Sequence, residues 1–187
     1  VEREMSAVQT ALGALVGGLT LGKFIQNTID AEREQAQLAA VLRSTGQAAG
    51  WNAEQLNRMA DALSRESVFA QGEITNAQIR LLSYTGIIGD VLPEAMQAVI
   101  DQADRMGISL EQSAEIIGRA LDKPSAGMAS LSKQGFKFTE DQKALAKQLE
   151  ETGRAADAQR MVLDALNESY GGAAKATRDS FAGAVAS

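Results

Sequence analysis

Residues 109–149 read SLEQSAEIIGRALDKPSAGMASLSKQGFKFTEDQKALAKQL, and this stretch decides the fold. It contains two capping boxes, in which Ser or Thr precedes Gln by three residues at a helix start: Ser109 with Gln112, and Thr139 with Gln142. Apolar residues follow each box at helical spacing, and Pro124 and Gly135 separate the two periodic runs. The stretch therefore predicts short helices, each with its own start and stop.

The same pattern continues outward in both directions. Upstream, Asn52 stands three residues before Gln55 and predicts another capped helix, and Pro93 and Gly107 bracket a further one. The residues predicted to face inward from that helix are Met96, Val99, Ile100, Ala103 and Met106. Downstream, residues 155–170 predict a helix that ends at Gly171-Gly172, followed by an alanine-rich terminal helix. Strand character is confined to residues 136–138, which have no visible partner strand.

The front of the chain differs from this punctuated part. Residues 5–22 carry no charge, and residues 23–43 have an amphipathic helical pattern, so the two runs together predict a long helix of about 40 residues. Its glycines repeat a small-xxx-small spacing that lets helix backbones approach closely, and they form a candidate helix-association face: Gly13, Gly17, Gly18 and Gly22. A soluble helix start and a membrane-active or self-associating helix both fit residues 5–25.

These observations predict an all-α protein with two parts. Residues 1–45 form a long amphipathic helical lead-in with a Gly-rich apolar segment, and residues 46–187 form a compact module of short capped helices. Val1 in place of Met, and an alanine-rich end without a stop signal, predict a piece of a longer chain.

Composition excludes most catalytic chemistry. The 187 residues include no Cys and no His, so thiolate nucleophiles, Ser/His triads and imidazole or sulfur metal sites are absent. The formal charge of −6 argues against a sequence-specific grip on nucleic acid. We therefore predict no catalytic residue, no metal ligand and no cofactor.

The remaining candidate sites have structural interpretations. The carboxylate pairs Glu111 with Glu115 and Glu140 with Asp141 are typical of solvated helix starts. The lysines between 133 and 147 alternate with acidic residues, which predicts a mixed solvated face. Gly171-Gly172 lacks the rest of a phosphate-binding loop and predicts a linker or helix cap. Trp51 is predicted to pack against Leu56 or a neighbouring helix.

An ordered set of segments carries a family resemblance. ALDKP (120–124), SLSKQGFKFTEDQK (130–143), ETGRAADAQRMVLDAL (151–166) and YGGAA (170–174) follow one another, after the upstream segments AQLAAVLRSTGQAAG, LNRMADALSRES and ITNAQIRLLSYTGIIG. In this order they resemble the N-terminal region of tailed-phage and prophage tail length tape measure proteins. The resemblance covers nearly the whole chain after about residue 30.

The resemblance implies a virion protein of the tail lumen that is present in the host cytoplasm during assembly. It implies partnership with tail tube and tail tip proteins and with tail assembly chaperones, a part in setting tail length, and departure from the tail at genome ejection. No catalytic residue is carried over from the family.

Four further expectations stay open. The small-residue face predicts a homo-oligomer. Residues 5–25 suggest transient membrane contact, and the first alternative function is a membrane-active, channel-forming segment. The second is part of a cell-wall lytic protein.

Overall fold

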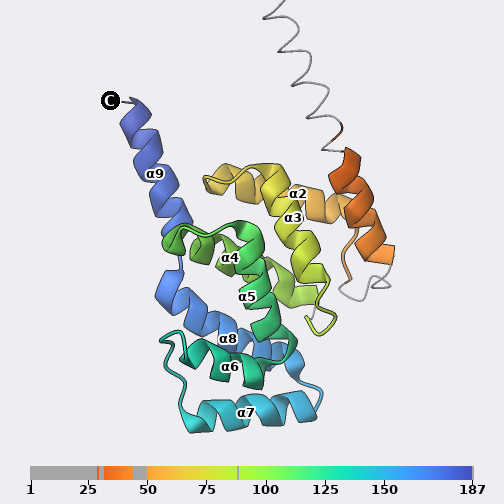
Figure 1. The fold of residues 1–187 in the computed structure, drawn as a ribbon, viewed down its shortest axis with the longest axis vertical. Helices are drawn as coiled ribbons and strands as arrows, with labels where there is room; N and C mark the ends of the chain where they lie inside the picture. The colour runs from red at the N-terminus through yellow and green to blue at the C-terminus, as the bar shows by residue number, and fades with distance from the viewer. Residues whose placement is uncertain (1–28, 30–31, 44–49, 88, 187) are drawn as a thin grey trace, which may run out of the picture. The chain divides into compact units, whose positions relative to one another are not determined.

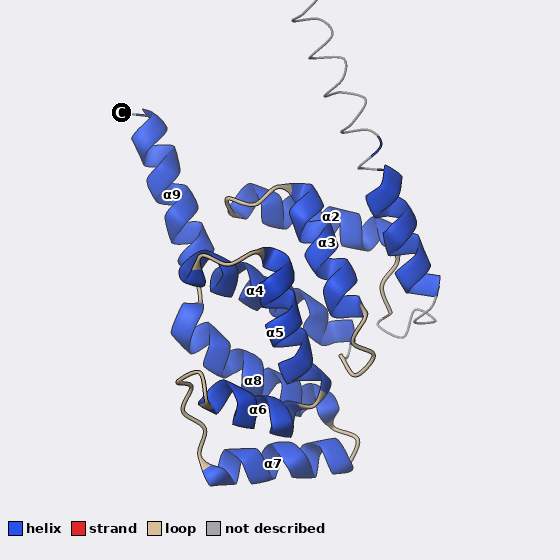
Figure 2. Cartoon of the chain, in the orientation of Figure 1, coloured by secondary structure: helices blue, strands red, loops and turns tan. Residues whose placement is uncertain are grey.

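The computed structural model describes residues 29, 32–43, 50–87 and 89–186, with side chains to residue 181. Helices and connecting loops make up all of these residues, as Figures 1 and 2 show, and none of them forms a strand. The prediction of an all-α fold is therefore confirmed for the described part. Residues 136–138 form a loop, so their weak strand character was misleading; Phe136 instead stacks on Phe138 and packs edge-on against Tyr170.

Residues 32–43 are helical and precede the labelled elements of Figure 1. The labelled elements are α2 (Ala53–Glu66), α3 (Gln71–Leu82), the 3-10 turn η1 (Gly89–Val91), α4 (Leu92–Met106), α5 (Leu110–Asp122), α6 (Pro124–Ser132), α7 (Glu140–Glu151), α8 (Ala155–Tyr170) and α9 (Ala173–Ala186).

Local capping chemistry fixes where several helices begin. Asn52, Ser109 and Thr139 each accept a hydrogen bond from the backbone N–H three residues on, and the Gln at that position accepts one in return. These reciprocal bonds pair backbone donors that the first helical turn leaves free. All three predicted capping boxes are present.

α4 begins and ends where the sequence predicts. Pro93 lies in its first turn, and Gly107 ends it with φ of 64°, a left-handed conformation that favours glycine. Four of the five residues predicted to face inward from α4 are buried. Met106 is the exception, with 47% of its surface exposed, because it is the last residue of the helix.

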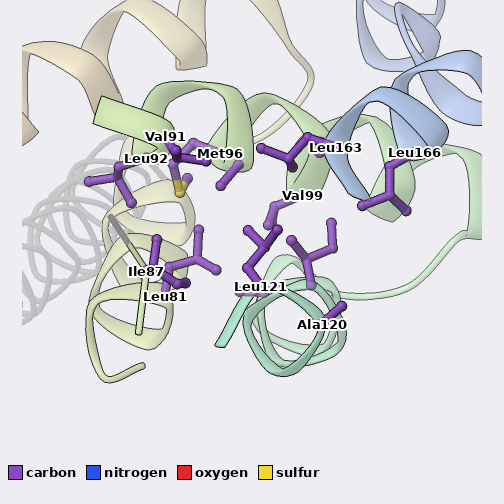
Figure 3. Packing of buried hydrophobic residues seen from close by; sticks show 14 of the residues in the cluster. Leu81, Ile87, Val91, Leu92, Met96, Val99, Ala120, Leu121, Leu163 and Leu166 are labelled. Atoms are coloured by element: carbon purple, nitrogen blue, oxygen red, sulfur yellow. The ribbon is translucent and has the colours of Figure 1, made fainter. Parts of the chain in front are cut away.

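α4 also lies at the centre of the core. It packs against α5, α8 and α9, and Figure 3 shows its side chain Val99 lying between Leu163 of α8 and Leu121 of α5. Most of these side chains are almost completely excluded from water. Burial of one such side chain stabilises the fold by roughly 1.5–3 kcal/mol. The buried side chains of α4 therefore contribute much of the free energy of folding.

A buried polar clasp joins α8 to the turn after α3. The backbone N–H of Gly86 donates to the carboxylate of Asp122 at 3.0 Å, and the Gly86 carbonyl accepts from Gln159 Nε2 at 2.6 Å. The same Gln159 nitrogen donates to the Leu121 carbonyl at 2.9 Å. The clasp pairs the backbone groups of Gly86, in the turn after α3, and the Leu121 carbonyl, in the last turn of α5, and so fixes the position of α8.

The chain divides into two units, Val1–Ala36 and Gln37–Ser187. In the first unit, the described residues 29 and 32–36 are helical. In the second, Leu38 and Leu42 join the buried cluster. The predicted long N-terminal helix lies mostly outside the described residues, and the division into residues 1–45 and 46–187 stays a prediction.

Candidate functional site

In the first predicted carboxylate pair, Glu115 takes part in two ion pairs. Glu115 of α5 accepts from Arg80 of α3 at 2.9 Å and also pairs with Arg119 one turn further along α5. The hydrogen bond from Arg80 and the charges of both arginines hold the pKa of Glu115 below its usual range, and the pKa of Arg80 is raised in turn. This arrangement keeps Glu115 ionised, which suits an ion pair between helices and not a general acid.

The second pair and the lysine cluster lie on α7 and before it. Glu140 pairs with Lys143 at 2.8 Å, and Lys147 lies 3.9 Å from Glu151. Such exposed pairs along a helix contribute only a few tenths of a kcal/mol. Their geometry agrees with the prediction of a mixed solvated face.

Trp51 and the pair Gly171-Gly172 each have a structural role. Trp51 is partly buried against the core, and its indole N–H donates to the Gly89 carbonyl at 2.6 Å. Gly172 has φ of 78° and directly precedes α9. The interpretation of Gly171-Gly172 as a helix cap or linker thus fits its position.

The surface of the described part includes the following three grooves. One lies between α3, α5 and the helical residues 37 and 41, and it contains the Arg80–Glu115 pair. A second lies between α5 and α6 and contains Arg119 and Lys123. The third, of about 290 Å³, lies between α4 and α8, and we call it the α4–α8 groove.

The α4–α8 groove differs from the other two in the charge of its lining. Its apolar side chains are Ala98, Leu163 and Leu166. Its polar side chains are Glu94, Gln97, Asp101, Asp164 and Asn167, and Gly171 completes the wall. No lysine or arginine is among its lining residues. The groove therefore combines a floor of three almost fully buried apolar side chains with three carboxylates.

Asp101 is the most deeply buried of these carboxylates, with 2% of its surface exposed. Its oxygens accept hydrogen bonds from the backbone N–H groups of Gly172 and Ala174, each at 3.1 Å, and from Gln97 Nε2 at 3.1 Å. All three donors are neutral. Asp101 thus satisfies donors at the start of α9, where a negative charge is also favoured by the helix dipole.

Sequence reasoning did not single out this groove. Asp101 follows Ala98 by one turn on α4, next to the predicted inward stripe, and a carboxylate so close to an apolar stripe is the one available signal. Its partners in Gly171–Ala174 are some 70 residues away, and no local pattern connects them.

The predicted helix-association face, Gly13, Gly17, Gly18 and Gly22, lies outside the described residues. Within the described ranges, no helix has the length and hydropathy needed to cross a membrane. Among the same residues, no group of three or more acidic side chains could hold a metal ion.

Comparison with known proteins identifies a family. The sequence model described as "Prophage tail length tape measure protein" matches residues 2–142, well over half of the 187 residues. No curated protein and no solved structure matches the chain. The match agrees with the ordered segments ALDKP and SLSKQGFKFTEDQK and the all-helical fold. The chain therefore belongs to the family of prophage tail length tape measure proteins, which are structural components of the phage tail.

Proposed function

We propose that this chain is a non-enzymatic segment of a tail tape measure protein that acts in tail assembly and length determination, and that leaves the tail at genome ejection. The family match over residues 2–142 is the observation that carries this proposal. The proposed location is the lumen of the virion tail, with the host cytoplasm as the location during assembly.

Within that role we propose that residues 46–187 act as a docking module and residues 1–45 as a helical lead-in. A molecular ruler gains about 1.5 Å per residue only where its helix is continuous. The described helices α2 to α9 are instead short and pack against one another, and this supports a role as a contact surface and not as a ruler. The proposed partners are tail tube and tail tip proteins, the tail assembly chaperones and further copies of this chain.

In-frame deletion of residues 46–187 from the phage gene tests this proposal. If these residues dock other tail components, tails fail to assemble or lose their uniform length, as electron microscopy would measure. If the residues instead serve as ruler, tails assemble normally and are shorter by about 210 Å, the length of 142 residues of continuous helix. That second outcome would overturn the proposal that residues 46–187 act as a docking module. The exposed substitution Asp141→Asn serves as the control and should leave tail length unchanged.

A further inference from the structure

The three carboxylates of the α4–α8 groove differ in how far their charge is neutralised. Asp101 is bonded only to neutral N–H groups. Glu94 has a single cation nearby, Arg160, whose Nε lies 3.9 Å away and whose guanidinium makes a closer contact of 2.8 Å with Asp90. Asp164 is exposed and has no ion pair among the described residues. The groove thus presents negative charge that the described chain leaves largely uncompensated.

The kind of cation that fits is set by two further observations. These carboxylates do not form a metal site, because no cluster of three or more acidic side chains among the described residues could hold a metal ion. Leu163, Leu166 and Ala98 form the apolar floor of the groove, with 4%, 1% and 8% of their surfaces exposed, and a hydrated inorganic cation would not use this floor. A cation on an aliphatic stem meets both conditions, because the stem packs on apolar side chains while the charged end reaches the carboxylates.

We propose that the α4–α8 groove receives a lysine or arginine side chain from an amphipathic segment of another tail protein. Complementary charge carries the argument for this occupant: the groove lining is acidic and contains no cation of its own. The stem would lie over the exposed edges of Ala98 and Leu163, and the cation would lie between Asp164 and Glu94. Only the statement that the partner is a tail protein rests on the proposed function.

The chemistry can be tested with a small probe on the 187-residue protein. We would titrate n-butylammonium chloride and follow backbone and side-chain NMR signals, with 1-butanol and sodium butyrate as probes of equal chain length. Saturable shifts at Leu163, Asn167 and Gly171 are expected with n-butylammonium alone, and 0.5 M NaCl should weaken them because salt screens exposed charges. Equal shifts with butanol, or no saturable shift, would overturn the proposal.

Matched variants separate the groove from general surface charge. Asp164→Asn and Glu94→Gln keep side-chain shape and remove one rim charge each, so each should raise the dissociation constant for n-butylammonium at least threefold. Asp141→Asn removes one exposed charge from α7, outside the groove, and should leave it unchanged. Equal weakening by all three variants would mean that net charge and not the groove binds the probe. Unchanged far-UV circular dichroism and melting temperature establish that each variant is folded.

Cross-linking in assembled tails then tests the occupant. A photo-reactive amino acid at Asn167 should cross-link to a segment of another tail protein that carries Lys or Arg within one helical turn, as mass spectrometry of the joined peptides would identify. Cross-links between two copies of this chain would overturn the proposed occupant. If the probe binds but the protein enters no tails, the proposed function fails while the groove chemistry stands.

Discussion

At the scale of single residues, Gly118 lies in helix α5 where a methyl group would collide with the ring of Tyr84. Alanine is favoured over glycine inside a helix by roughly 1 kcal/mol, so intrinsic propensity and packing act in opposite directions here. We expect packing to win, with Gly118→Ala lowering the free energy of unfolding by about 1–3 kcal/mol in urea titrations. The Tyr84→Ala background supplies the control: without the ring, Gly118→Ala should stabilise. An equal loss of stability in both backgrounds would show that the added methyl group clashes with a residue other than Tyr84.

The ion pairs of Glu115 predict how the stability of the fold depends on pH. Because its pKa is lowered in the folded protein, its ion pairs stabilise the fold above the unfolded pKa of about 4.3 and lose this effect as the pH falls through the lower folded value. Urea unfolding of the wild type and of Glu115→Gln should therefore differ most at pH 7 and converge towards pH 3. The same comparison in 0.5 M NaCl should show a smaller difference. A difference that does not vary with pH would contradict this interpretation.

At the scale of helices, the attachment of α9 depends on Asp101. Asp101→Ala removes the acceptor for two backbone N–H groups at the start of α9 and should reduce stability by about 2 kcal/mol. Hydrogen exchange should show faster exchange in α9 than in α5. Asp179→Asn, which changes an exposed carboxylate on α9 itself, is the matched control and should have little effect. If both variants behave alike, the carboxylate of Asp101 does not hold the helix.

Helix starts could be predicted from the sequence because their chemistry is local. Asn52, Ser109 and Thr139 bond within three residues of themselves, so the pattern and the structure coincide. The clasp at Gly86 and the cap at Asp101 could not be predicted, because the residues that they join lie between 36 and 73 positions apart in sequence. The α4–α8 groove depends on the same long-range packing, which explains why its carboxylates were not singled out.

At the scale of the whole molecule, the family match ends at an earlier residue than the folded core does. The match stops at residue 142, within α7, whereas α8 fills part of the core and supplies Gln159 to the clasp. A chain ending at residue 142 should therefore lose cooperative unfolding in urea, because it exposes the face of α4 that α8 covers. A chain ending at residue 171 keeps α8 and should retain a cooperative transition. Cooperative unfolding of the shorter chain would show that α8 is dispensable.

The composition predicts modest heat stability for the whole chain. Aromatic residues make up only 4% of the sequence, and many buried positions hold alanine, so each contact removes little apolar surface from water. We expect a melting transition by differential scanning calorimetry within or below the range of about 45–65 °C that is usual for mesophilic domains. A transition well above this range would contradict the expectation that the packing is only marginally stable.

The connections of α8 and α9 also determine how the molecule responds to force. Both helices return to residues 86–104, so a pull on the C-terminal end first loads the bonds of α9 to Asp101 and to Asp104, which accepts from Thr177. We expect the clasp of α8 at Gly86 to be loaded only after these bonds have broken. We therefore expect sequential peeling from the C-terminal end, in which small groups of bonds break in turn. A chain drawn lengthwise through a tube would then extend at lower tension than one whose contacts must all shear together.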